Sequence, residues 1–463
     1  MDPTDSGGHE HIDHIPTHRP HLPRHAHVRG LRPVLTPTDE GYATELGGFN
    51  LIAAPAADLV VGATNADDVA LAVRYARANG FRVGARATGH GLPIEGRGTV
   101  VVTTSRLNSI TVDPVARTAR VGAGVRWRDV VAATTPHGLT GVVGSSSSVG
   151  VVGYTLGGGL SPLGRRFGWA ADHVRSIELV TADGVVRSVD ASAGSDLFWA
   201  ILGGRDGFGI VTAIEFELFD LPTVYGGGIF FAGSAARDVL HAWRDWAPTL
   251  PEEAGTSVAV LRLPPDPDLP APLQGQLAVH VRYTHTGDPA AAAALLAPMR
   301  SAGPILLENV DILPTAALDA VHMDPAGPMP SVERGVLLGE FPAAAVEALL
   351  EVAGPQVPSP PAIVEVRLLG GTSATAAARA ERGRRTPRRL FRDRDRSAGP
   401  TARRPGGSAP AGGRRRTGAV AVRRAAELLR APRRRPRRSV GTRRAAATGD
   451  DPPPARPGGG TGE

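Results

Sequence analysis

The sequence contains neither cysteine nor lysine, and both absences narrow the chemistry open to the chain. Without cysteine there is no disulfide and no thiolate metal site. All 51 basic residues are arginines, so a P-loop, which needs a lysine, is excluded. Long apolar runs are also missing, and the first thirty residues lack the apolar core of a secretory signal. We therefore expect a cytoplasmic protein with no membrane partner.

The chain is long enough for two or three domains, but its charge is unevenly distributed. It has 463 residues, of which 42% are hydrophobic, and a formal net charge of +6. Residues 371–463 hold 25 arginines against 7 acidic residues, a net charge of +18. Residues 1–370 hold 26 arginines against 38 acidic residues, a net charge of −12. The two segments are therefore interpreted separately.

Residues 1–33 hold seven of the fourteen histidines, interleaved with proline. Histidine-rich tracts can bind metal. Pro16, Pro20 and Pro23 interrupt any regular face of ligands, so we favour a disordered arm. No metal-ligating residue is assigned in this sequence.

A strand–helix–strand pattern begins at Leu59 and leads into the hexapeptide 86–91, Arg-Ala-Thr-Gly-His-Gly. The predicted strands are 59–61 and 81–85, and Asn65 is the expected N-cap of a helix over 66–79. A turn punctuated by glycine after a strand can bring N–H groups close to a phosphate. An ordinary surface turn would show the same letters, so the hexapeptide alone decides nothing.

Two further glycine-rich segments follow within the same region of alternating strands and helices. Residues 149–159 hold five glycines, which disfavours both helix and strand and predicts either a backbone track against a ligand or tight packing turns. Residues 203–209 lead into a strand at 210–216. Three such segments suit a long, doubly phosphorylated cofactor. The Rossmann pattern G-x-G-x-x-G after a strand is missing. Other expected elements are strands at 100–102, 110–112, 118–121, 177–181 and 185–189 and a helix at 127–135.

Beyond about residue 223 the pattern favours a sheet covered by helices on one face. Helices are predicted at 234–246, 289–299 and 343–352, and strands at 257–263 and 276–284. In the second strand Val279, Val281 and Tyr283 point to one face, and His280 and Arg282 to the other.

At these motifs the chain resembles the PCMH-type FAD-binding oxidoreductases of the vanillyl-alcohol-oxidase superfamily, in the branch of berberine-bridge-enzyme-like, oxygen-dependent FAD-linked oxidoreductases. The resemblance covers about residues 34–371 and is carried by six ordered motifs, at 86–91, 118–125, 149–159, 178–184, 196–200 and 207–212. It implies an α+β fold, with a two-subdomain FAD-binding domain at 34–222 and an antiparallel-sheet substrate domain, incomplete here, at 223–371.

The resemblance also implies the cofactor, FAD, and its contacts. His90 would be the covalent attachment point, and the rest of the hexapeptide would cradle the pyrophosphate. The second segment would line the flavin, and the strand after the third would meet its adenosine or isoalloxazine side. A second, cysteinyl bond is excluded because Ser146 occupies that position. The cofactor-binding residues are Arg86, Ala87, Thr88, Gly89, His90, Gly91, Gly150, Val151, Gly153, Gly157, Gly158, Gly159, Ile210 and Val211.

The implied reaction is hydride transfer from an alcohol, a sugar or a secondary metabolite to FAD, followed by reoxidation by dioxygen. The partners are thus a small-molecule substrate and dioxygen. A base must accept the proton of a substrate hydroxyl group. Five side chains are available, but each is more readily explained as a packing or surface residue, so the catalytic residue stays unknown. They are Tyr154, Tyr225, Tyr283, His280 and His285.

Residues 372–463 depart from the family pattern as a basic tail rich in Arg, Pro and Gly that we expect to be disordered. The change of charge and the loss of periodicity suggest a frame-shifted reading of the gene. Translating the other frames tests this. The chain would then be a truncated flavoprotein relative with little or no activity. A genuine tail that binds nucleic acid is the rival interpretation. Nucleic acid is not the expected partner, because the tail lacks interleaved aromatic residues.

Overall fold

The computed structural model describes residues 33–91, 96–358 and 361–374, and the backbone of residues 420–425. Within these residues the chain mixes helices and sheets, which confirms the predicted α+β class. The predicted N-terminal arm lies outside the described residues except for Pro33. So do residues 375–419 and 426–463 of the predicted tail.

The N-terminal sheet is built on a strand–helix–strand unit, as the sequence predicts. Both β2 and β3 lie parallel to β4, which is buried between them, and β1 is antiparallel to β2. The Asn65 side chain accepts a hydrogen bond of 2.9 Å from the Asp68 N–H and so caps α2. The elements are β1 (Val34–Leu35), α1 (Tyr42–Leu46), β2 (Leu59–Gly62), α2 (Ala66–Ala78), β3 (Arg82–Arg86) and β4 (Thr99–Thr103).

An antiparallel sheet follows, in the spatial order β5–β6–β10–β8–β9. Val69 of α2, Val100 of β4 and Ile214 of β10 belong to one hydrophobic core, so this sheet and the first are packed on shared apolar side chains. The strands are β5 (Ile110–Asp113), β6 (Thr118–Gly122), β8 (Val174–Val180), β9 (Val186–Asp190) and β10 (Ile210–Glu217). The helices are α3 (Trp127–Thr134), α4 (Val151–Leu156), α5 (Gly164–Phe167) and α6 (Ser195–Ile201). A short pair is formed by β7 (Leu139–Thr140) and β11 (Phe219–Asp220).

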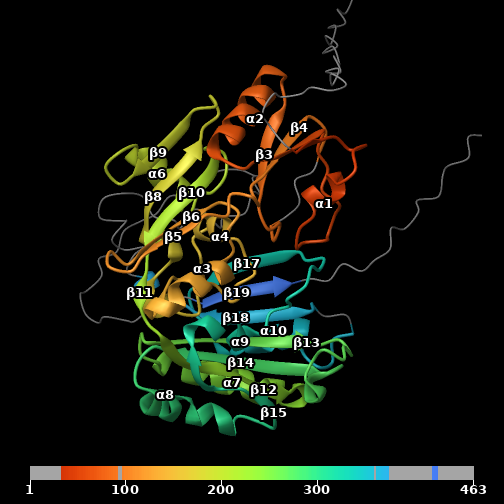
Figure 1. Ribbon diagram of the computed structural model, residues 1–463. Coiled ribbons are helices and arrows are strands. Elements are labelled where there is room, and N and C mark those ends of the chain that lie inside the picture. The colour runs from red at the N-terminus through yellow and green to blue at the C-terminus, as the bar shows by residue number, and fades with distance from the viewer. Residues whose placement is uncertain (1–32, 92–95, 359–360, 375–419, 426–463) are drawn as a thin grey trace, which may run out of the picture. The chain divides into compact units, whose positions relative to one another are not determined.

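The largest sheet is antiparallel throughout, and Figure 1 shows its strands lying side by side. Its order is β15–β12–β14–β13–β18–β19–β17, and β16 also pairs with β12. The strands are β12 (Thr223–Ala232), β13 (Ala254–Arg262), β14 (Leu277–His285), β15 (Ile305–Glu308), β16 (Asp311–Pro314), β17 (Glu333–Leu338), β18 (Ile363–Leu368) and β19 (Val420–Ala425). The helices of this region are α7 (Ala236–Trp246), α8 (Pro289–Leu296), α9 (Asp319–His322) and α10 (Ala343–Ala353).

The strand β19 departs from the prediction that residues 372–463 are disordered. It pairs with β18 on one side and with β17 on the other. Only the two valines of its sequence, Val-Ala-Val-Arg-Arg-Ala, favour a strand, and it lies within an arginine-rich segment. Two facing strand edges supply the hydrogen-bond partners that composition alone cannot reveal.

The two faces of the large sheet differ in chemistry. On one face Val279, Val281 and Tyr283 pack against α7, α8 and α10 in a single apolar core, as predicted. The opposite face carries His280, Arg282 and Glu365, which are buried nonetheless. Buried charges must be paired or bind a ligand, so this polar face needs an explanation of its own.

Candidate functional site

The hexapeptide 86–91 is a loop of unpaired N–H donors at the end of β3. Among the described residues, the N–H groups of Thr88, Gly89, His90 and Gly91 donate no hydrogen bond. Gly89 has a φ of 68°, the left-handed conformation that turns successive N–H groups toward one side. A run of such donors is a site for an anion, as a phosphate-binding loop requires.

The backbone of this loop is held in place by the segment before β2. Phe49 N–H donates to Thr88 O at 3.1 Å, and Asn50 N–H donates to Gly89 O at 2.9 Å. The carbonyl groups of Thr88 and Gly89 are therefore bonded within the protein, while the N–H groups of residues 88–91 are left for a ligand. Arg86 is buried beneath the turn, where its Nε donates to Gly47 O at 3.3 Å.

His90 is half-buried, with both ring nitrogens next to hydroxyl groups. Nδ1 lies 2.8 Å from Thr88 Oγ1, and Nε2 lies 3.3 Å from Ser148 Oγ. The ring stacks on Phe49, with centroids 4.2 Å apart. Burial, and then the nearby Arg126 guanidinium, lower the pKa of His90 to about 4. The imidazole is therefore neutral at neutral pH and keeps a nitrogen lone pair for bonding.

The second glycine segment differs from its prediction, because it begins as a helix. Residues Val151–Leu156 form α4, with Gly150 as the N-cap. Val151, Val152 and Leu156 are buried, so packing outweighs the low helix propensity of this short stretch. The structure brings Gly150 to the hexapeptide, where its N–H donates to Thr88 Oγ1 at 3.3 Å.

The glycines after α4 are tight packing turns, one of the two alternatives that the sequence left open. Gly158 and Gly159 have φ values of 105° and 73°. A Cβ at Gly159 would lie 2.5 Å from that of Ala170, and a Cβ at Gly158 would lie 3.5 Å from the Trp169 ring. Gly153 is different: the only described atom within 4 Å of a Cβ there is Arg205 Nη2, at 3.9 Å. Gly153 thus borders open space, as a ligand track would.

The third segment supplies a cation to the same place. Arg205 Nη2 lies 3.5 Å from the position of a Cβ on Gly91, so the guanidinium stands next to both Gly91 and Gly153. Gly203 N–H donates to Leu156 O at 2.8 Å and ties this segment to the end of α4. Ile210 and Val211 begin β10 and pair with Val180 and Leu179 of β8. The three predicted segments therefore converge, although Gly157, Gly158 and Gly159 serve mainly to connect and pack.

This arrangement fits FAD. The cofactor carries two adjacent phosphates, and the structure offers unpaired N–H donors, a cation at Arg205 and side-chain-free surface at Gly91 and Gly153. A Cβ at Gly89 would lie 2.8 Å from the Gly48 Cα. The close approach of the loop to the backbone at Gly48 therefore depends on glycine. The residues present are thus compatible with a bound pyrophosphate group.

Comparison with known proteins also points to FAD. The model of the FAD binding domain family matches residues 57–190. The chain contains an FAD-binding domain. The predicted resemblance and the predicted cofactor are thereby confirmed. The covalent bond at His90 stays a prediction.

Two curated relatives are similar to about half of the chain. The FAD-dependent monooxygenase prx3 of Penicillium roqueforti is 34% identical over 242 residues, which are 51% of this chain and 46% of that protein. The (R)-6-hydroxynicotine oxidase of Paenarthrobacter nicotinovorans is 34% identical over 205 residues, 44% of this chain and 42% of that protein. The chain thus spans about half the length of the curated relatives it matches.

Solved structures extend the likeness of fold beyond the FAD-binding domain. The 6-hydroxy-D-nicotine oxidase of Arthrobacter nicotinovorans superposes with a TM-score of 0.66 at 23% identity, over 86% of this chain and 81% of that one. The BBE-like 1 protein of Physcomitrella patens gives 0.66 at 18% identity, over 87% and 82%. None of the helices in the described part of the chain is long and apolar enough to cross a membrane.

The side chains considered as catalytic bases all have partners within the protein, and the catalytic residue stays unknown. Tyr154 OH donates to Val142 O at 3.1 Å, and Tyr283 OH donates to Ala292 O at 3.3 Å. Burial raises the pKa of both phenols above their usual range. His280 is stacked on Phe230, with ring centroids 3.7 Å apart. Tyr225 lies 3.3 Å from Arg300 Nη2, and His285 Nδ1 accepts from Gly287 N–H.

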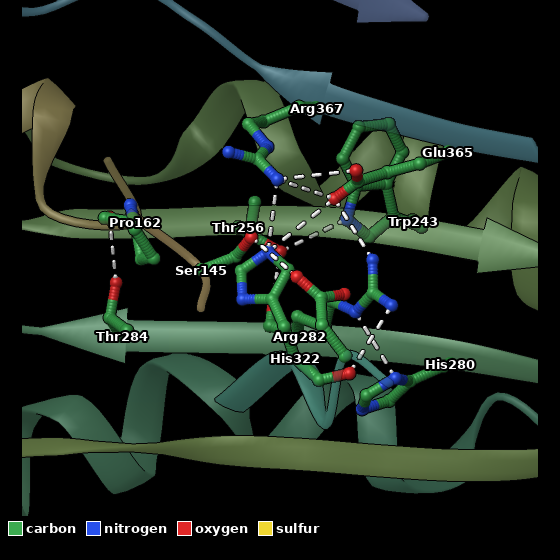
Figure 2. Close-up of polar contacts among 11 residues, drawn as sticks. Ser145, Pro162, Trp243, Thr256, His280, Arg282, Thr284, His322, Glu365 and Arg367 are labelled. Carbon is green, nitrogen blue, oxygen red and sulfur yellow. Dashed lines mark hydrogen bonds and ion pairs between the residues drawn. The ribbon is translucent and has the colours of Figure 1, made fainter. Parts of the chain in front are cut away.

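A buried cluster that the sequence analysis did not single out lies on the polar face of the large sheet. Figure 2 shows Glu365 between Arg282 and Arg367, with His322 beside them. Glu365 Oε1 lies 3.0 Å from Arg282 Nη1 and 3.0 Å from Arg367 Nη2. The two guanidinium groups hold the pKa of Glu365 well below its usual range despite burial. The one sequence signal was the alternation of charged and apolar residues along β14 and β18.

Proposed function

We propose that the chain is an FAD-dependent oxidoreductase that removes hydride from a C–H bond of an alcohol, a sugar or a secondary metabolite, with dioxygen as the final electron acceptor. The unpaired N–H donors of the 88–91 loop carry this proposal, because they form an anion site inside an FAD-binding domain. The names of the relatives support it, since they include an FAD-dependent monooxygenase and an (R)-6-hydroxynicotine oxidase.

When bound, FAD supplies a ring that accepts two electrons and passes them to dioxygen. The chain supplies position and charge. The N–H groups of residues 88–91, together with Arg205, hold the phosphates. His90 is neutral and offers a ring nitrogen for a covalent tether, as the resemblance implies. Ser146 and Ser148 are linked by a 2.8 Å hydrogen bond, and Ser148 in turn contacts His90, which fixes the orientation of the imidazole.

The cofactor and the tether are tested together with purified full-length protein. We expect a yellow protein whose flavin absorbance remains in the pellet after acid precipitation. The His90→Ala variant releases its flavin into the supernatant, whereas His137→Ala, a change at an exposed position, keeps it in the pellet. Flavin released by the wild type refutes the tether but leaves FAD binding intact. A colourless protein refutes the function and favours the inactive, truncated relative.

A further inference from the structure

A small pocket lies on the polar face of the large sheet, next to the end of the predicted flavin track. It is lined by Leu160 and Pro162, which follow Gly159 directly, and by Ser257, His322 and Arg367. Its free volume is about 20 Å³, enough for one small polar group. A whole substrate molecule does not fit inside this volume, but the head group of one does.

The register of the sheet places the polar residues of this pocket in one row. Ser257 of β13 is paired with Arg282 of β14 on one side and with Arg367 of β18 on the other. Side chains directly opposite one another in a sheet project from the same face. The row therefore brings two guanidinium groups to either side of a hydroxyl group. Glu365 and His280 occupy the next row, on either side of Ala259.

The groups that remain unpaired in this row are hydrogen-bond donors. His322 Nε2 lies 3.1 Å from Arg367 Nη2, which can only donate, and 3.5 Å from Glu365 Oε1, which can only accept. The shorter contact favours Nε2 as the acceptor. The neutral ring then carries its proton on Nδ1. Within the described residues, His322 Nδ1 and Ser257 Oγ are buried without a hydrogen-bond partner. Arg367 Nε and Nη1 bond to none of the described residues, and in Figure 2 a guanidinium nitrogen of Arg367 has no contact with the other residues drawn.

The charges in the pocket are also unbalanced. Arg282 and Arg367 are both buried, and Glu365 compensates one of them. His322 is neutral, because burial and then Arg282 lower its pKa to about 4. Arg165 also lines the pocket, but its nitrogens donate to main-chain carbonyl groups. The described lining residues include three arginines and no carboxylate, and Glu365 beside them supplies one negative charge, so the pocket keeps an excess of positive charge. A buried charge of this kind calls for a counter-ion.

We infer that this pocket binds the carboxylate group of the substrate, and so restricts the proposed oxidoreductase to substrates that carry one. The carboxylate accepts from Arg367, His322 Nδ1 and Ser257, while the rest of the substrate extends past Leu160 toward the predicted flavin track. A volume of about 20 Å³ leaves more room for a small planar carboxylate than for a tetrahedral phosphate. The inference rests on the proposed function for its link to catalysis.

The binding of a carboxylate is measured without turnover, by titrating full-length protein with benzoate in a calorimeter. Benzamide is the neutral probe of the same shape, and sodium chloride matches the ionic strength. We expect benzoate to bind at least about tenfold more tightly than benzamide, as charge-assisted hydrogen bonds require. Equal affinities, or no heat from either probe, overturn the inference.

Two substitutions locate the site. Arg367→Met weakens benzoate binding by about tenfold or more, while Arg300→Met, which breaks an ion pair with Glu308 elsewhere, leaves it unchanged. Ser257→Ala weakens it by about two- to tenfold and leaves folding intact, because Ser257 Oγ has no partner to lose. Ser188→Ala, at an exposed position on β9, is its control. Wild-type affinity in both pocket variants overturns the inference and makes the cluster purely structural.

The two proposals fail in different ways. A colourless protein that binds benzoate through Arg367 and Ser257 refutes the proposed function and keeps the carboxylate site. A yellow protein that oxidises neutral compounds and does not bind benzoate keeps the function and refutes the site.

Discussion

The glycine at position 89 provides a direct test of the phosphate-binding loop. In Gly89→Ala the new residue must adopt a φ of 68°, and its Cβ would lie 2.6 Å from Arg86 Nη2 and 2.8 Å from the Gly48 Cα. The left-handed conformation costs an L-residue about 1–2 kcal/mol. Arg86 can move aside, but the Gly48 backbone is fixed by the hydrogen bonds of Phe49 and Asn50 to the loop. Forcing extra volume into such a contact adds about 1–3 kcal/mol.

Gly80→Ala separates the strain from the clash. Gly80 has a φ of 71°, close to that of Gly89, but a Cβ there would meet no atom within 4 Å. In this control the free energy of unfolding should fall only by the cost of the backbone strain, about 1–2 kcal/mol. In Gly89→Ala the free energy of unfolding should fall by about 1–3 kcal/mol more, because the clash adds to the same backbone strain.

Both variants are unfolded in urea and followed by far-UV circular dichroism, and FAD binding is followed by the quenching of flavin fluorescence. We expect a lower urea midpoint for Gly89→Ala than for Gly80→Ala, and weaker FAD binding in Gly89→Ala alone. Equal midpoints would show that the loop accommodates a methyl group, which contradicts the contact with Gly48. Unchanged FAD affinity in Gly89→Ala would instead refute the assignment of this loop to the cofactor.

Two further predictions concern the buried cluster. Glu365→Gln leaves Arg282 and Arg367 without a counter-charge and should lower the free energy of unfolding by about 3–5 kcal/mol, measured in urea, whereas Glu347→Gln, at an exposed ion pair, should change it little. The pKa of His322 is about 4 in the folded chain and about 6.5 when unfolded, so the unfolded chain binds the proton first as pH falls. Stability should therefore fall from about pH 6.5 toward pH 4, less steeply in His322→Asn; an identical slope in that variant contradicts the assignment.

Where local signals are strong, the sequence predicts the fold well. The Asn65 cap and the apolar stripe behind it place α2 correctly to within one residue. The pattern at 276–284 predicts β14 and its two faces. These features are set by hydrogen bonds and side chains only a few residues apart, so a single sequence contains them in full.

Elements decided by distant partners were not predictable in this way. The strand β12 contains Gly226, Gly227 and Gly228, a composition that argues against a strand. Its third glycine is needed because a Cβ there would collide with the His280 ring, which comes from the neighbouring strand β14. Likewise, β19 becomes a strand through pairing with β17 and β18 rather than through its own composition.

The candidate site shows the same difference between local signals and partners distant in sequence. The hexapeptide 86–91 could be found because its glycines and histidine are contiguous. The pocket proposed to bind a carboxylate could not be found in this way, because Ser257, His322 and Arg367 come from elements far apart in sequence, and charged residues alternating along a strand usually face water. In this sheet the polar face is buried as well, and the groups left unpaired on it can donate hydrogen bonds. These unpaired groups can donate and lie beside an excess of positive charge, which is why we propose a ligand that accepts hydrogen bonds and carries negative charge.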